Sequence, residues 1–115
     1  MNIRKYDIVQ VKFTGTIGSE QGGIRPAVVI QNNIGNMHSN TTIVIPMTCK
    51  LKNLNQPTHT LIKKNVDNGL EKDSIVLGEQ IRVISNKRIV KKIGSLVDKI
   101  EQQAIRKIYF ANFDD

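Results

Sequence analysis

The segment Val9-Gln10-Val11-Lys12-Phe13 alternates apolar and polar side chains, and the segment Pro26-Ala27-Val28-Val29-Ile30-Gln31 is almost entirely apolar. Alternation with a period of two is typical of a β-strand that is buried on one face only. A short, continuous apolar run is typical of a central strand in a sheet. Together, the two segments predict that the first part of the chain belongs to a β-sheet.

Four later stretches are rich in β-branched or alternating apolar residues. We expect short strands over residues 41–48, 58–62, 74–77 and 80–84. Pro46 has no backbone N–H to donate, so the strand that contains it is predicted to lie at a sheet edge or to include a bulge.

The end of the chain has a different periodicity. Ser95 and Asp98 have the spacing of a capping box, which predicts the start of a helix. Apolar residues then recur at helical spacing: Val97, Ile100, Ala104 and Ile108. We expect one amphipathic helix over residues 96–109. The predicted fold class is mainly β (α+β), a small, strongly bent antiparallel sheet or barrel with a C-terminal helix. The lack of strand–helix alternation argues against a Rossmann-like fold.

The chain has 115 residues, the size of one domain, so we expect residues 1–115 to form a single domain. Apolar residues make up 39% and charged residues 23%, which fits a globular protein and not a disordered basic tail. No apolar run approaches the ~20 residues that span a bilayer, and no signal peptide is visible. Cys49 is the single cysteine, so an internal disulfide is excluded. We expect a soluble, cytoplasmic protein with no membrane association.

The net charge is +7, from 17 Lys and Arg against 10 Asp and Glu. Residues 1–66 carry eight of the basic and only two of the acidic side chains. Such a surface attracts polyanions, although a basic balance also serves solubility alone. Five further cations lie between Gln80 and Val97 with no acid among them: Arg82, Lys87, Arg88, Lys91 and Lys92. They fit either a solvated face or a track that binds backbone phosphates.

Two residues have side chains that suit phosphate. Residues 14–24 hold four of the eight glycines. This composition fits a loop that lets a substrate approach its backbone, and it also fits a plain hairpin connection. Arg25 follows, and the proline after it favours extended geometry. Its guanidinium presents a planar fork that fits phosphate oxygens. Thr48 ends the third expected strand with a hydroxyl that can hydrogen-bond to phosphate. Taken singly, Arg25 also fits a surface ion pair and Thr48 an ordinary strand position.

His38 and His59 are candidates for the acid–base pair of a metal-independent ribonuclease. His38 lies in a polar stretch where solvation accounts for it, whereas His59 stands at a strand entry and is the better candidate to contact a ligand. The acidic residues are scattered, which does not support metal-dependent chemistry, so we expect neither metal nor cofactor. Cys49 lacks a catalytic histidine arrangement and is expected to be a packed thiol.

Three segments together resemble the MazF/PemK family of toxin endoribonucleases, and they keep the family's order. The first is residues 18–36, where Gly18-Ser19-Glu20-Gln21-Gly22-Gly23-Ile24-Arg25-Pro26 precedes an apolar strand and an Asn/Gly turn. The second is Pro57-Thr58-His59. The third is Glu79-Gln80-Ile81-Arg82-Val83-Ile84, followed by Lys87-Arg88-Ile89 and Ile93-Gly94. The chain is most similar to the Gram-positive members.

The resemblance implies a CcdB/MazF-type, SH3-like small barrel that works as a homodimer. It also implies the toxin of a type II toxin–antitoxin system, which cleaves single-stranded mRNA at short sequences without metal. Attack by the RNA's own 2′-hydroxyl would leave a 2′,3′-cyclic phosphate and a 5′-hydroxyl, and so inhibit translation and growth. Matched by position, Arg25 and Thr48 would be the catalytic pair. We expect Arg25 chiefly to stabilise charge on the phosphate oxygens, and the general base stays open.

The same resemblance implies that the glycine-rich loop flanks an RNA groove and reads base edges there. The expected RNA contacts are Ser19, Glu20, Gln21, Gly22, His59, Gln80 and Arg82. The implied protein partner is a cognate MazE-like antitoxin, whose acidic, disordered tail would lie in the same groove.

Two other classes of protein stay open. A toxin of the same fold that binds DNA gyrase without chemistry relies on a C-terminal tail with tryptophan, and this chain has no tryptophan. A noncatalytic SH3-like RNA-binding module would leave Arg25, Thr48 and the Glu-Gln-Gly-Gly loop unexplained.

Overall fold

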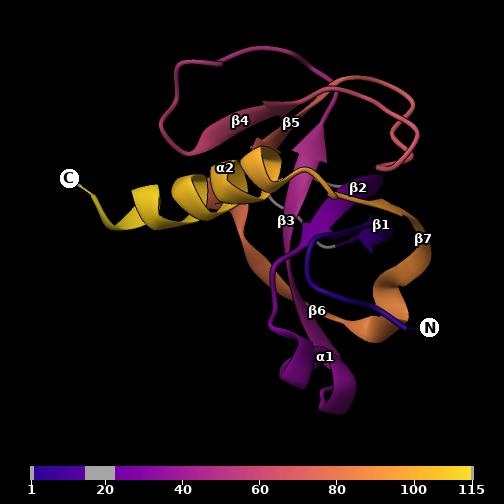
Figure 1. The fold of residues 1–115 in the computed structure, drawn as a ribbon. Coiled ribbons are helices and arrows are strands. Elements are labelled where there is room, and N and C mark those ends of the chain that lie inside the picture. The colour runs from indigo at the N-terminus through magenta and orange to yellow at the C-terminus, as the bar shows by residue number, and fades with distance from the viewer. Residues whose placement is uncertain (1, 15–22, 115) are drawn as a thin grey trace.

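The fold is a bent antiparallel sheet with one long helix beside it (Figure 1), in a computed structural model that describes residues 2–14 and 23–114. The strands are β1 Asp7–Phe13, β2 Gly23–Val29, β3 Thr41–Thr48, β4 His59–Ile62, β5 Ser74–Leu77, β6 Arg82–Ser85 and β7 Ile89–Ser95. The helices are α1 Asn33–His38 and α2 Lys99–Phe110, and the 3₁₀ turns are η1 Gly78–Gln80, η2 Asn86–Arg88 and η3 Ala111–Phe113.

Six of the seven strands follow the order β4-β5-β3-β2-β1-β7, and the seventh, β6, pairs with β3 off this path. Every pairing in this sheet is antiparallel. The predicted mainly β class with a C-terminal helix is therefore confirmed. Within residues 2–14 and 23–114, no helix has both the length and the apolar character needed to cross a membrane.

Pro46 lies in the middle of the sheet, so the prediction of an edge strand is wrong. β3 pairs with β2 along one side, where Pro46 is opposite Ala27. Along its other side, β3 pairs with β6 through residues 41–44 and with β5 through residues 47–48. Pro46 falls in the gap between these two pairings, where a missing N–H breaks no ladder.

The core consists of two apolar clusters. One cluster packs beneath α2 and contains Ile8, Val28, Ile45, Met47, Ile62, Leu70, Val76, Leu96, Ile105 and Ile108. The other contains Val9, Val11, Phe13, Ala27, Val29, Val44 and Ile84. Neighbouring residues of β1, β2 and β3 alternate between the clusters, as the period of two requires. Both faces of β2 and β3 are therefore buried where these residues lie, whereas β1 is buried mainly on one face beyond Ile8, because Gln10 is only half-buried and Lys12 is exposed.

The C-terminal helix is present, but its start and its buried face differ from the prediction. Asp98 is the N-cap, and its Oδ1 accepts the Ile100 N–H at 2.7 Å. Ser95 instead donates to Asp7 Oδ1 at 2.7 Å and ends β7. The buried face carries Ile105 and Ile108, whereas Val97 and Ile100 are 60% and 79% exposed. The apolar stripe is thus shorter than the spacing predicted.

Two local elements also differ from the prediction. Residues 33–38 form α1 rather than a loop, because the Asn32 side chain caps the turn by accepting the Gly35 N–H at 2.8 Å. The strand predicted over residues 80–84 starts only at Arg82. Residues 78–80 form η1, in which the Gly78 N–H donates to the Thr58 carbonyl at 2.8 Å.

The segment between β4 and β5, residues 63–73, crosses close over β7. Asn68 is fully buried, and its side chain donates to the Lys63 carbonyl at 2.9 Å and accepts the Leu70 N–H at 3.0 Å. The Ser95 N–H donates to the Asp67 carbonyl at 2.8 Å. A Cβ on Gly94 would lie 2.4 Å from the Asp67 carbonyl oxygen, so only glycine allows this crossing.

We expect Gly94→Ala to lower the free energy of unfolding by about 3 kcal/mol, because the new methyl group meets backbone atoms that cannot move aside. Urea unfolding followed by circular dichroism measures this loss. Gly23→Ala is the control, since a Cβ there meets nothing within 4 Å. Its positive φ of 73° should cost only about 1 kcal/mol. Equal losses in both variants would contradict the steric explanation.

Candidate active site

Arg25 and Thr48 stand at the same end of the β2–β3 pair. Ala27 is opposite Pro46 in this antiparallel pairing. Arg25 lies two residues before Ala27 and Thr48 lies two residues after Pro46, so the register places them at matching positions where the strands part. The structure thereby brings together the two residues that the sequence singled out separately.

A pocket of about 360 Å³ opens at this end of the sheet. Four strands and two connecting segments contribute polar side chains to it: Gln10 of β1, Arg25 of β2, Cys49 after β3, Glu71 and Lys72 before β5, Ser74 of β5, and Lys91 of β7. Three of these side chains are cationic and one is anionic. The pocket therefore favours an anionic ligand, as phosphate is.

Thr48 stands between two residues that line this pocket but is not itself part of the lining. The residue is 7% exposed, and its Oγ1 accepts the Lys50 N–H at 3.2 Å. Its neighbours Met47 and Cys49 both line the pocket. A threonine hydroxyl can donate one hydrogen bond while it accepts another, so Thr48 can serve as a donor to a ligand.

Cys49 is exposed, so the prediction of a packed thiol is wrong. The cysteine is the first residue after β3, where the chain leaves the buried sheet. The side chain consequently faces the pocket rather than the core. His38, by contrast, ends α1 and is exposed to solvent, as predicted.

Gln80 and Arg82 lie outside the lining of the Arg25 pocket. Gln80 is the last residue of η1, and Arg82 opens β6 opposite Val44. The Arg82 guanidinium lies 5.0 Å from the centroid of the Phe13 ring, a cation–π contact. The other four expected RNA contacts, at positions 19–22, lie outside the described residues. All these RNA contacts stay predictions.

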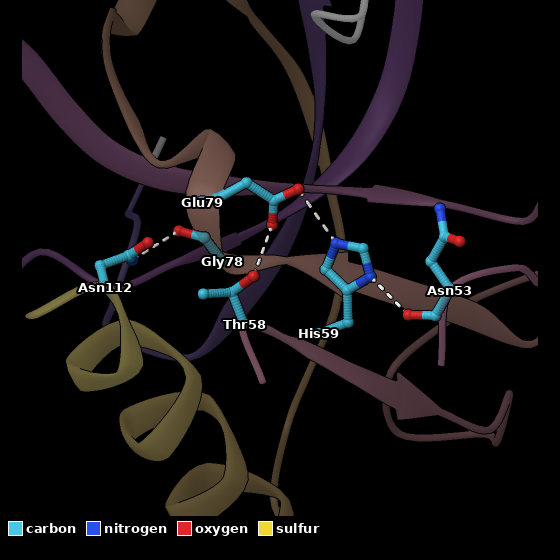
Figure 2. Close-up of polar contacts among 6 residues, drawn as sticks. All are labelled: Asn53, Thr58, His59, Gly78, Glu79 and Asn112. Carbon is cyan, nitrogen blue, oxygen red and sulfur yellow. Dashed lines mark hydrogen bonds and ion pairs between the residues drawn. The ribbon is translucent and has the colours of Figure 1, made fainter. Parts of the chain in front are cut away.

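His59 belongs to a separate polar cluster beside α2, which Figure 2 shows. The imidazole is 6% exposed, and its Nε2 lies 3.0 Å from Glu79 Oε2. Its Nδ1 lies 2.9 Å from the Asn53 carbonyl oxygen. Thr58 Oγ1 donates to Glu79 Oε1 at 3.0 Å. Both ring nitrogens of His59 are thus already in hydrogen-bonding contact within the protein.

The pKa of the Glu79 carboxyl lies below its usual value. Partial burial raises this pKa, but hydrogen bonds from His59, from its own backbone and from Thr58 lower it further than burial raises it. Glu79 is accordingly a carboxylate at neutral pH, which accepts hydrogen bonds and does not donate. Among the residues that the structure describes, no three His, Cys, Asp or Glu side chains group as a metal site would require.

Two pocket cations were not singled out as site residues by the sequence. Lys91 pairs with Gln10 across β1 and β7, and it belongs to the basic run after Gln80, which was the available signal. Lys72 reaches the pocket only because the segment before β5 folds over β7 at Gly94. No local pattern in the sequence indicates that crossing.

Comparison with known proteins places this chain in a family. Residues 4–110 match the family described as PemK-like, MazF-like toxin of type II toxin–antitoxin system. The chain is 41% identical over 100 residues to "Endoribonuclease EndoA" of Bacillus subtilis, covering 87% of this chain and 85% of that protein.

Solved structures share the fold. MazF from Deinococcus radiodurans superposes with a TM-score of 0.82 at 20% identity, covering all of this chain and 99% of that one. An endoribonuclease in complex with its cognate antitoxin, from a mycobacterial species, gives a TM-score of 0.76 at 14% identity, with 96% and 94% covered. With the family match extending over nearly the whole chain, this protein belongs to the PemK-like, MazF-like toxins of type II toxin–antitoxin systems.

Proposed function

We propose that this toxin is a metal-independent endoribonuclease that cleaves single-stranded mRNA at specific short sequences in the cytoplasm. The observation that carries the proposal is the placement of Arg25 and Thr48 at the same end of the β2–β3 pair, where Arg25 lines a cationic pocket. The 41% identity to a protein named an endoribonuclease supports the same activity. Cleavage of mRNA would stop translation and so arrest growth.

The proposed reaction is an in-line displacement at phosphorus. The RNA 2′-hydroxyl loses its proton to a base, and its oxygen forms a bond to the adjacent phosphorus. The bond from phosphorus to the 5′-oxygen breaks, and that oxygen takes up a proton. The products are a 2′,3′-cyclic phosphate and a 5′-hydroxyl. The nucleophile belongs to the substrate, so the protein need only position the strand, move protons and stabilise charge.

Arg25 and Thr48 supply hydrogen-bond donors for the charge that develops on the non-bridging phosphate oxygens. Donors fixed in advance stabilise a transition state without reorganising during the reaction. Arg25 is fixed by its strand and by Pro26, and Thr48 by burial and its bond to Lys50. A guanidinium holds its proton too firmly to serve as the base, which stays unassigned.

The protein partner in this proposal is a MazE-like antitoxin with an acidic, disordered tail. Such a tail would be attracted by the same cations that attract RNA, and it would block the pocket when it folds onto it. The mycobacterial relative, whose structure holds its cognate antitoxin, supports this partner. We further propose that the toxin acts as a homodimer.

RNA cleavage tests the proposal directly. The purified, antitoxin-free protein is incubated with long single-stranded RNA in EDTA, and the new ends are sequenced. We expect cuts at a recurring short sequence with cyclic-phosphate and 5′-hydroxyl ends. Intact RNA after incubation with folded protein would refute the proposal.

Arg25→Ala and Thr48→Ala should each lower the rate of RNA cleavage by roughly 10²–10³-fold, because each removes one transition-state donor. The measurement is single-turnover cleavage of an oligonucleotide that carries the mapped cut site. Two control variants replace the same residue types at other places: Arg106→Ala on the exposed face of α2, and Thr41→Ala at the other end of β3. Normal cutting by Arg25→Ala and Thr48→Ala would show that the catalytic pair lies elsewhere.

Lys72→Ala and Lys91→Ala should weaken RNA binding and flatten its dependence on salt, because both cations line the Arg25 pocket. Removing one cation that neutralises a phosphate should lower the slope of log K against log salt by about 0.7 for a single strand. Fluorescence anisotropy in a Thr48→Ala background measures binding without cleavage. Lys99→Ala, at the start of α2, is the control. An unchanged slope in the pocket variants would place the RNA backbone on another surface.

A further inference from the structure

The cluster around His59 joins two stretches that are separate in the sequence, residues 49–62 and the turn η1 (Figure 2). His59 opens β4, the Asn53 carbonyl belongs to the loop of residues 49–58, and Glu79 belongs to η1. This loop begins directly after Thr48, and η1 ends at Gln80. The imidazole therefore bridges the segment next to the proposed catalytic threonine and the turn that carries a proposed RNA contact.

Both hydrogen-bond partners of His59 are acceptors. The Asn53 carbonyl has no hydrogen to donate, and Glu79 is ionised at neutral pH. A neutral imidazole carries only one N–H, so it can donate to one of these partners but not to both. Both bonds form together only when each ring nitrogen carries a hydrogen, as in the imidazolium ion. A buried imidazolium beside a carboxylate makes a charge-assisted bond, which is stronger than a neutral one.

Thr58 ties the end of the loop to η1, through its carbonyl to the Gly78 N–H and through its hydroxyl to Glu79, whereas the middle of the loop is tied through His59. Residues 51–57 are all exposed, so burial of apolar surface contributes little to their conformation. Asn53 adopts a positive φ of 59°, and its carbonyl accepts both the Gln56 N–H at 3.2 Å and His59 Nδ1 at 2.9 Å. The His59 bond thus fixes the loop at its midpoint.

The other end of the bridge is rigid. The Gly78 N–H donates to the Thr58 carbonyl at 2.8 Å, and a Cβ on Gly78 would lie 2.6 Å from that oxygen. The Gly78 carbonyl in turn accepts the Asn112 side-chain amide at 3.0 Å. Glu79 is therefore a fixed point from which His59 can hold the loop.

We propose that His59 and Glu79 are a positioning pair for RNA cleavage, which holds the loop of residues 49–58 at a set distance from η1. This inference rests on the proposed ribonuclease function. It assigns His59 an effect through the loop rather than a contact with RNA, because either nitrogen would have to leave its present partner to reach a substrate.

A double-mutant cycle tests the pair. His59→Ala, Glu79→Ala and the double variant are compared with the wild type for kcat and KM on an oligonucleotide with the mapped cut site. Each single variant should lower kcat about 10- to 100-fold, since small misplacements of reacting groups have effects of this size. The loss in the double variant should be smaller than the product of the two single losses, because both single variants remove the shared His59–Glu79 contact, while each also removes one bond of its own, with Asn53 or with Thr58. Glu79→Gln keeps an acceptor for Nε2 and should recover most of the activity.

Hydrogen–deuterium exchange supplies a readout that does not depend on activity. Amides of residues 50–58 should exchange faster in His59→Ala and in Glu79→Ala than in the wild type. Asn86→Ala is the matched control, since it also removes two side-chain bonds, to Thr42 and to Ser39, next to α1 rather than beside this loop. That variant should leave both exchange in the loop and kcat unchanged.

The outcomes separate the possibilities. If Glu79→Ala cuts like the wild type while His59→Ala raises KM, then His59 contacts RNA directly and the positioning proposal is wrong. Unchanged exchange over residues 50–58 in both variants would also overturn it. If the wild type does not cut RNA at all, the proposed function fails, whereas the exchange experiment still decides whether the pair holds the loop.

Discussion

The antiparallel pairing of β2 with β3 determines where the candidate catalytic residues stand. Val28 is opposite Ile45 and Val29 is opposite Val44, and all four are fully buried. The first pair packs in the cluster beneath α2 and the second in the other cluster. A slip of one residue would exchange the two faces, so burial on both sides fixes the register. The backbone positions of Arg25 and Thr48 follow from that register.

The parts of the fold that could be predicted are those whose cause is local. Alternation in β1 and the apolar run of β2 reflect the burial of neighbouring residues, and the sequence records that burial directly. The short helix α1 was missed because its cap is a single asparagine, Asn32, within a polar stretch. The helical stripe was overestimated because spacing shows which residues share a face but not how far the sheet extends beneath them. Val97 and Ile100 lie beyond the part of the sheet that packs against the helix, so both are exposed.

The candidate site likewise contains residues that the sequence indicates locally and residues that only the fold brings there. Arg25 and Thr48 carry their own signals, namely the proline after one and the strand end at the other. Lys72 has no such signal in the sequence. It reaches the pocket through a crossing at which buried Asn68 meets Gly94, and these two residues are far apart in the chain. For His59, the position at a strand entry suggests contact with a ligand, but the sequence does not show what surrounds the imidazole. Only the fold shows that both of its nitrogens already have partners.

Strands and loops contribute to this site through different forces. The strands that carry Arg25 and Thr48 are held by buried apolar side chains, which cannot be rearranged without unfolding the sheet. The loop of residues 49–58 is exposed and is held by a few hydrogen bonds, among them those of His59 and Thr58. Hydrogen bonds of this kind can be lost while the fold persists, because each contributes only about 1 kcal/mol net. The core therefore sets the positions of the strands that carry Arg25 and Thr48, whereas the position of the loop depends on hydrogen bonds that a single substitution can remove.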